Sequence, residues 1–253
     1  MTSASLGGLA PLVPELLAGR PLAVLAGAGV SAESGLPTFR GPGGIWEGRN
    51  AMELATPEAF AEDPARVWRF YEWRRMKLRE ARPNAGHVAL ARMETLVPRV
   101  TLVTQNVDGL HRLAGSRNVL ELHGTILATR CTGCGARDKG PDAPFPALPP
   151  FCACGKMLRP DVVWFGEMLP EGVFEAAAEA AAESFVFLVV GTSSVVAPAS
   201  SLAMIASRGG AKVFEVNPEE TPLAPFADGC FRQTSAAFLP LLADALERER
   251  GVA

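Results

Sequence analysis

Four cysteines stand in two close pairs whose spacing is typical of a metal site. Two residues separate Cys131 from Cys134, one separates Cys152 from Cys154, and 17 lie between the pairs. Four thiolates complete the tetrahedron that structural zinc prefers and leave no position open for water. Four unrelated thiols would not predict glycines beside both pairs. We therefore predict one structural zinc ion on these four residues, whereas Cys230 lies apart and is expected to be an ordinary thiol.

A glycine-rich segment follows the first apolar run and could hold a phosphate. Residues 27–32 read GAGVSA, which matches the pattern G-x-G-x-x-[GA], where glycines let the backbone approach a pyrophosphate. A dehydrogenase would continue through a helix to a second strand with an acidic ribose-binding residue, but residues 35–44 are too rich in glycine and proline for one continuous helix. Judged alone, the segment is explained equally well as a glycine turn.

Of the three histidines, His123 is the best candidate for a general base. It follows the short apolar segment 119–122 and precedes Gly124, so its side chain could face a crevice. The ordinary pKa of histidine, near neutrality, suits proton transfer. His87 lies in a helical pattern and is expected to be structural, and His111 is explained by capping or packing near a helix start. Spacing alone supports no Ser-His-Asp triad.

Tyr71 and Arg74 are spaced i, i+3 on a predicted helix and therefore share one helix face. With Val67, Phe70 and Leu78 they follow the rhythm of a buried stripe, so Arg74 stands where an apolar residue is expected. A guanidinium at such a position needs an anion as its partner. The alternative is an arginine that extends past its neighbours to solvent, and the pattern does not decide between the two.

The elements that must position these residues alternate along the chain. Runs rich in apolar and β-branched residues predict strands at 21–26, 100–104, 185–190 and 212–216. A helix predicted over 198–207 joins the last two strands as a βαβ unit, which implies parallel strands. Ligands of such sheets bind beyond the carboxyl ends of the strands. The segments expected to converge there are 27–40, 105–108, 191–193 and 217–219.

The predicted fold class is α/β, a doubly wound parallel sheet with a smaller inserted domain. Two stretches do not fit the alternation of strands and helices. In one, 42–83, Asp63 can cap a helix that Pro64 opens and Pro83 stops; the other, 126–159, is rich in Gly, Pro and Cys. These two insertions are expected to form the small domain. The segments expected to form the larger domain are 1–41, 84–125 and 160–253.

The composition excludes several classes of protein. The chain has 253 residues, 48% of them hydrophobic and 20% charged, which is typical of a globular protein and not of a disordered one. A net charge of −3 offers no positive field for nucleic acid. The longest purely apolar run, 185–190, is far shorter than the roughly 18 residues that cross a membrane. We expect a cytoplasmic monomer that binds neither nucleic acid nor membrane.

Taken in order, the motifs resemble those of the sirtuin family over nearly the whole chain. The matching segments are GAGVS at 27–31, GLPTFR at 35–40, QNVD at 105–108, HG at 123–124, the four cysteines, FGE at 165–167, GTS at 191–193 and VNP at 216–218. Each motif is weak alone, but the ordered set is specific. The family consists of NAD-dependent protein lysine deacylases with a Rossmann-like NAD-binding domain and a smaller domain that contains a helical part and a zinc module. The resemblance therefore implies that NAD is a co-substrate and zinc is structural.

The resemblance also implies which residues meet NAD. The glycine-rich loop would hold the diphosphate, with Phe39 over the nicotinamide ribose and Arg40 near the phosphates. Asn106 and Asp108 would line the nicotinamide pocket, and Asn217 with its neighbours would meet the adenosine. The full set expected at NAD is Gly27, Ala28, Gly29, Ser31, Glu33, Pro37, Phe39, Arg40, Trp46, Gln105, Asn106, Val107, Asp108, Gly191, Thr192, Ser193, Asn217, Pro218, Glu219 and Ser235. The sequence departs from the family at 233–235, where QTS replaces the more usual Gly-x-Ala.

His123 matches the catalytic base of the family. The implied reaction begins when the acyl oxygen of a modified lysine attacks C1′ of the nicotinamide ribose and nicotinamide leaves. Neutral His123 then removes a proton from a ribose hydroxyl, so that the sugar oxygen can attack the acyl carbon. Water completes the reaction. The products are free lysine, nicotinamide and O-acyl-ADP-ribose.

The resemblance further implies how an acylated protein is bound. Segment 162–167 resembles the strand on which the family holds an acyl-lysine peptide in extended form. Tyr71 and Arg74 resemble the Tyr-x-x-Arg pair of the branch that prefers succinyl and malonyl groups, so we expect these groups and acetyl as substrates. The residues expected at the substrate are Tyr71, Arg74, Val162, Phe165, Gly166 and Glu167.

Three alternative functions remain. A hydride-transferring NAD dehydrogenase would explain the glycine-rich loop but not the closed cysteine site. A zinc-ribbon binding module would explain the cysteines but leave the other motifs without a role, and the net charge of −3 disfavours nucleic acid as its ligand. Within the sirtuin family, ADP-ribosyl transfer to protein is the third alternative.

Overall fold

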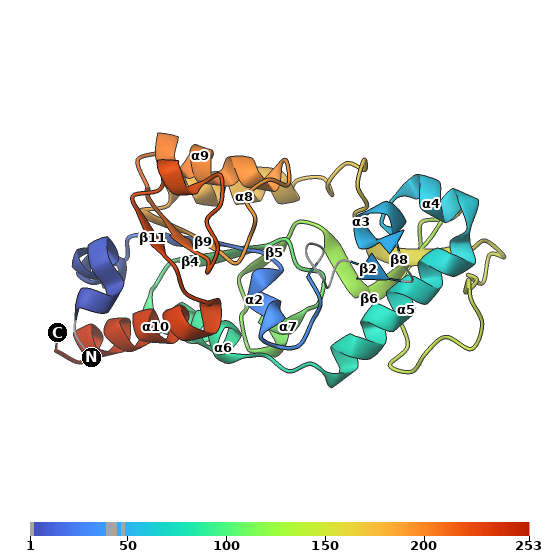
Figure 1. Ribbon diagram of the computed structural model, residues 1–253, viewed down its shortest axis with the longest axis horizontal. Helices are drawn as coiled ribbons and strands as arrows, with labels where there is room; N and C mark the ends of the chain where they lie inside the picture. The colour runs from blue at the N-terminus through green and yellow to red at the C-terminus, as the bar shows by residue number, and fades with distance from the viewer. Residues whose placement is uncertain (1–2, 39–44, 47–48, 253) are drawn as a thin grey trace.

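A six-stranded parallel sheet forms the centre of the larger part of the protein (Figure 1). The computed structural model describes residues 3–38, 45–46 and 49–252. Neighbouring strands pair in parallel, with Leu22 of one central strand opposite both Val100 and Val186. In spatial order the strands are β11 (Gly229–Phe231), β10 (Lys212–Val216), β9 (Val186–Val190), β1 (Leu22–Ala26), β4 (Val100–Thr104) and β5 (Val119–Glu121).

Both faces of this sheet are buried, which explains why its strands are almost continuously apolar. Along β1, Leu22 and Val24 contribute to the core on one face, and Ala23 and Leu25 to the core on the other. The first face is covered by α6 (Ala85–Leu96), α10 (Ser235–Val252), α1 (Val13–Leu17) and η1 (Ser3–Leu12). The opposite face is covered by α8 (Val173–Glu183) and α9 (Leu202–Arg208), which follows η3 (Ala199–Ser201) (Figure 1). Among the described helices, none is both long and apolar enough to cross a bilayer.

The four predicted strands are confirmed, as is the helix between β9 and β10. The structure adds the edge strands β5 and β11, which were not predicted. Each has three residues, and the burial along them is mixed, so neither shows the long apolar run of a central strand. The predicted α/β fold with a doubly wound parallel sheet is therefore confirmed.

A smaller part of the protein lies beyond the carboxyl ends of these strands and has a core of its own (Figure 1). Its central helix, α5 (Pro64–Glu80), begins where predicted: the Asp63 carboxylate accepts a hydrogen bond from the backbone N–H of Arg66 at 2.9 Å. An antiparallel sheet of β7 (Arg137–Lys139), β6 (Gly124–Cys131) and β8 (Leu158–Val162) packs against α5. The remaining elements here are β2 (Ile45–Trp46), β3 (Arg49–Asn50), α3 (Ala51–Leu54) and α4 (Pro57–Glu62). The core of this smaller part also includes Val162 and Trp164, which lie just beyond the expected segment 126–159. The boundaries 42–83 and 126–159 therefore stay a proposal.

Candidate active site

A cavity of about 790 Å³ lies at the carboxyl ends of β1, β4, β9 and β10, between the two parts of the protein. Its volume is typical of a pocket for a small molecule or cofactor. Each of the four segments expected to converge there contributes residues to its wall. The predicted residues among its walls are Gly27, Ala28, Gly29, Ser31, Glu33, Pro37, Tyr71, Arg74, Gln105, Asn106, Val107, Asp108, His123, Val162, Phe165, Gly166, Glu167, Gly191, Thr192, Ser193, Asn217, Pro218, Glu219 and Ser235.

The glycines at the base of the cavity allow two loops to lie in direct backbone contact. A Cβ atom on Gly27 would lie 2.7 Å from Cα of Thr192, and one on Gly29 would lie 2.7 Å from the carbonyl oxygen of Gly191. Gly191 itself has a φ of +60°, which side chains rarely adopt. These glycines therefore do form the tight turn that was considered as the alternative to a phosphate site. The same glycines also line the cavity, so main-chain groups form this wall, as a closely approaching pyrophosphate would require.

A buried network of polar side chains holds the glycine-rich loop after β1. Ser31 donates to Asp108 at 2.7 Å and lies 3.4 Å from Nε2 of His87. Asn106 donates to the carbonyl oxygen of Gly27 at 3.0 Å. The structure thus brings a serine, a histidine and an aspartate together, but the Ser31 proton is directed to the carboxylate, which does not create an activated nucleophile. His87 was expected to be structural. Its contact with Ser31 could not be expected from local pattern, because Ser31 lies 56 positions away in the sequence.

His123 lies in the cavity with one ring nitrogen fixed by the backbone. Its Nδ1 is 3.0 Å from the carbonyl oxygen of Gln105. A carbonyl oxygen can only accept a hydrogen bond, so Nδ1 carries the proton and Nε2 keeps its lone pair. Burial lowers the pKa of His123 below 6.5, and the bond to Gln105 opposes this shift in part. The imidazole is therefore neutral at pH 7 and can act as a base.

These properties predict how the reaction rate depends on pH. With His123 as the general base, the neutral imidazole is the active form. Because burial lowers its pKa from 6.5, the rate should be at its plateau at pH 7 and fall only as the pH drops through the lowered pKa. The measurement is kcat/KM against pH with an acetylated peptide, because the acetyl group has no carboxylate that would titrate in the same range. A midpoint of the acidic limb above 6.5 would contradict the assignment.

Tyr71 and Arg74 reach the same cavity from α5. The Tyr71 oxygen accepts a hydrogen bond from Nε1 of Trp164 at 2.9 Å, which leaves the tyrosine proton to be donated elsewhere. Burial raises the pKa of Tyr71 to about 12, so the hydroxyl stays protonated. Burial lowers the pKa of Arg74, while electrostatic interactions with Tyr71 and Asp108 oppose this shift. Trp164 was not anticipated, because Tyr71 lies 93 positions before it.

The segment expected to be a peptide-binding strand is mostly a loop, which corrects the prediction. Strand β8 ends at Val162, and a turn follows in which Glu167 N–H donates to the carbonyl oxygen of Trp164 at 3.0 Å and Gly166 has a φ of +86°. The Glu167 carboxylate binds Arg159 through two hydrogen bonds, at 2.6 and 2.8 Å, and accepts another from Trp164 N–H. Glu167 therefore stabilises the loop, although it also lines the cavity.

Not all residues expected at NAD are brought to this cavity. Trp46 is not among the described residues that line it; its ring instead packs on Phe70 with centroids 5.6 Å apart. Phe39 and Arg40 lie outside the described residues. Glu33 lines the wall, but its carboxylate accepts from Thr234 and from the backbone N–H of Ala236, so it also fixes the start of α10.

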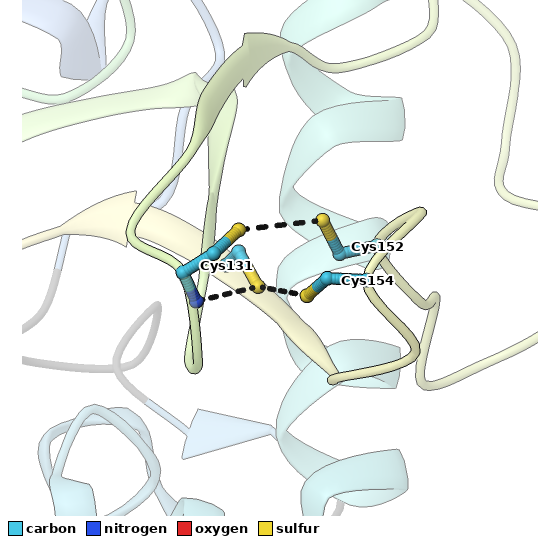
Figure 2. A group of neighbouring side chains, drawn as sticks. Cys131, Cys152 and Cys154 are labelled. Atoms are coloured by element: carbon cyan, nitrogen blue, oxygen red, sulfur yellow. Dashed lines mark hydrogen bonds between the residues drawn. The ribbon is translucent and has the colours of Figure 1, made fainter.

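The four paired cysteines come together at the end of the small antiparallel sheet. Figure 2 shows the sulfurs of Cys152 and Cys154 on the side that faces Cys131. The Sγ atoms lie within 4.8 Å of one another, with 3.4 Å between Cys131 and Cys154 and 3.8 Å between Cys134 and Cys152. Ligands about 2.3 Å from a tetrahedral zinc ion would be about 3.8 Å apart. Backbone N–H groups of Cys134 and Gly133 lower the pKa of Cys131 to about 6, which favours the thiolate. The arrangement fits one zinc ion, and none of the four lines the cavity.

The parallel sheet and the cavity at its strand ends define a Rossmann-like, dinucleotide-binding class of protein. Residues 27–198 match the model of the Sir2 family. "NAD-dependent protein deacylase 2" of Pyrobaculum aerophilum is 51% identical over 241 residues, which cover 93% of this chain and 95% of the relative. The chain belongs to the Sir2 family, the sirtuins.

Solved structures of the family have the same fold. A Sir2 homologue in complex with 2′-O-acetyl ADP ribose has a TM-score of 0.90 and 45% identity, over 94% of this chain and 96% of that one. A complex of Sir2 with a p53 peptide and NAD+ has a TM-score of 0.81 and 30% identity, over 98% and 99%. The predicted family and its class, the NAD-dependent protein deacylases, are thereby confirmed, as are NAD as co-substrate and a four-cysteine site placed to hold one structural metal ion.

Proposed function

We propose that this sirtuin removes acyl groups from lysine side chains of proteins with consumption of NAD, and that it prefers short acyl groups that end in a carboxylate. The observation that carries the proposal is the position of His123. Its unprotonated Nε2 shares one cavity with the glycine loops on one side and with Tyr71 and Arg74 on the other.

The residues around the cavity fit NAD. The backbone of Gly27, Gly29 and Gly191 offers a wall without side chains for the diphosphate, and Asn217 with its neighbours would meet the adenosine. When bound, NAD supplies the ribose carbon and hydroxyl groups to which the acyl group is transferred. His123 accepts a ribose hydroxyl proton at Nε2 while the Gln105 carbonyl fixes the ring. Asn106 and Asp108 would line the nicotinamide end.

The acylated lysine would enter between two loops of the cavity wall. Phe165 and Gly166 lie on one side, and Val195 and Val196 on the other. An extended peptide held there by its backbone would be bound with little regard to its sequence. A relative has been solved in complex with a p53 peptide and NAD+. Protein lysines are therefore the proposed partners. We also keep as proposals that the enzyme is a cytoplasmic monomer and that it does not bind nucleic acid.

The preference for an acidic acyl group follows from the chemistry of α5. Tyr71 can donate its proton because Trp164 occupies the oxygen as donor, and Arg74 provides a cation in the same wall. A carboxylate at the end of a succinyl or malonyl chain accepts both donors. An acetyl group has no carboxylate that could accept these hydrogen bonds.

One experiment tests the activity. A single lysine peptide, acetylated or succinylated, is incubated with the protein with and without NAD, and its mass is followed. We expect loss of the acyl group only with NAD, appearance of O-acyl-ADP-ribose, and faster loss of succinyl. Label from NAD that stays on protein would indicate ADP-ribosyl transfer, and an absorbance change at the NADH wavelength would indicate a dehydrogenase.

The role of Arg74 is tested by Arg74→Met. Loss of a charge-assisted hydrogen bond, worth about 1.5–3 kcal/mol, should lower the ratio of desuccinylation to deacetylation, measured as kcat/KM, by roughly 10- to 150-fold. Arg69→Met is the matched control, because Arg69 is on the same helix but exposed. An unchanged ratio in Arg74→Met would show that this residue does not bind the carboxylate.

A further inference from the structure

An ion pair between a buried glutamate and a partly exposed arginine lies beside the loop that follows β10. Glu215, on β10, has no exposed side-chain surface, and its Oε2 accepts a hydrogen bond from Nη1 of Arg232 at 2.6 Å. Arg232 directly follows β11, the short edge strand that pairs with β10 through Glu215 and Cys230. Neither Glu215 nor Arg232 is among the described residues that line the cavity.

This ion pair is bonded to the loop at both of its ends. The same Nη1 of Arg232 donates to the carbonyl oxygens of Asn217, at 3.3 Å, and Glu219, at 3.1 Å. The hydroxyl of Thr221 donates to the other oxygen of Glu215. One guanidinium nitrogen and one carboxylate therefore fix the course of residues 217–221, all of which line the cavity.

The loop is also bonded to the neighbouring loop after β9. Asn217 donates through Nδ2 to the carbonyl oxygen of Thr192 at 2.8 Å, and its Oδ1 accepts from Glu219 N–H at 3.1 Å. A displacement of the loop would thus move Asn217 relative to the loop after β9. His123 and Tyr71 lie on other elements, and among the described residues their side-chain hydrogen bonds go to Gln105 and Trp164, not to this cluster.

We propose that Glu215 and Arg232 are positioning residues for NAD: they hold the loop 217–221 in the shape that receives the adenosine end. This inference rests on the proposed function, in which that loop meets the adenosine. The pair touches neither the reacting atoms nor the acyl group. Its loss should therefore weaken binding of the nucleotide and leave the chemical step unchanged.

The test compares Arg232→Met and Glu215→Gln with the wild-type protein. We expect the Kd for ADP-ribose and the KM for NAD to rise about 5- to 50-fold in each, while kcat at saturating NAD and the KM for the acylated peptide stay within about twofold. The Kd for ADP-ribose of the double variant should be no higher than that of the single variant with the higher Kd, because the two residues act as one unit. Lys212→Met is the matched control: it removes the exposed Lys212–Asp228 ion pair at the other end of β10 and should change neither constant.

Each outcome decides the proposal. If Arg232→Met does not fold, because the buried Glu215 carboxylate then lacks its cation, the neutral Glu215→Gln variant gives the result. An unchanged Kd for ADP-ribose in a folded Glu215→Gln variant, or a fall in kcat with Kd unchanged, would overturn it. Wild-type protein that deacylates with NAD while both variants bind ADP-ribose normally would refute the positioning role alone. Wild-type protein that does not bind ADP-ribose would refute the proposed function and this inference with it.

Discussion

Replacing His123 with alanine should lower kcat for NAD-dependent deacylation by about 10²- to 10⁴-fold, the range typical of a lost general base. The Kd for ADP-ribose should stay within about twofold of wild type. The reason is geometric: Nδ1–H donates to the Gln105 carbonyl oxygen, so Nε2 carries the lone pair that can accept a proton, and the diphosphate wall is built from glycine backbone elsewhere. The measurements are single-peptide kinetics at saturating NAD and calorimetric binding of ADP-ribose.

His87→Ala offers a comparison with a second histidine. His87 contacts Ser31 behind the glycine-rich loop and does not line the cavity. Its loss should weaken nucleotide binding more than His123→Ala does. The role of His123 as base would be disproved by wild-type turnover in His123→Ala, or by a loss of activity that is explained entirely by weaker ADP-ribose binding.

Removal of one zinc ligand should have the largest effect on stability. In Cys134→Ser we expect the zinc content to fall from one ion per chain toward none and the pairing of β6 with β7 and β8 to loosen. Structural zinc contributes about 10–16 kcal/mol in zinc-finger peptides, and the loss of even a third of this, about 3–5 kcal/mol, would lower the Tm by roughly 6–20 °C. Metal analysis, thermal unfolding and hydrogen exchange of residues 124–162 measure these changes.

Cys230→Ser is the matched control for this substitution. Cys230 is exposed and lies outside the metal cluster, so its loss should leave zinc content and Tm unchanged. Because four protein sulfurs leave no open position on the ion, exchange of zinc for cobalt should preserve kcat. A Cys134→Ser protein that keeps one tightly bound zinc ion and its Tm would contradict the assigned ligand set.

The main features of the fold were predictable because they depend on local pattern. Central strands such as β1 and β9 are buried on both faces, so their residues form continuous apolar runs that stand out in the sequence. Helix α5 has a capping aspartate and a proline in its first turn, which mark its start. The edge strand β11 has no comparable sequence signal, because it has only three residues and is recognised by its pairing with β10.

The candidate site was predictable where motifs carry it and not where distant contacts do. Glycines, cysteines and His123 stand in patterns whose chemistry is visible in the sequence. The bond between Trp164 and Tyr71 and the bonds of Arg232 to the loop after β10 join residues that the fold alone brings together. The segment 162–167 was expected to be a peptide-binding strand from its resemblance to the family, but after Val162 Gly166 and the Glu167 carboxylate turn the chain.

The two sides of the cavity differ in how much variation they tolerate. On the nucleotide side, Gly27 and Gly191 lie against backbone, so almost any substitution there would be rejected by sterics. On the acyl side, Tyr71 and Trp164 belong to the core of the smaller part, where side chains face one another. New acyl selectivity can therefore arise by exchange of side chains in α5 and in the loop after β8, without rebuilding nucleotide recognition. A combinatorial library for altered substrate range belongs on these two segments.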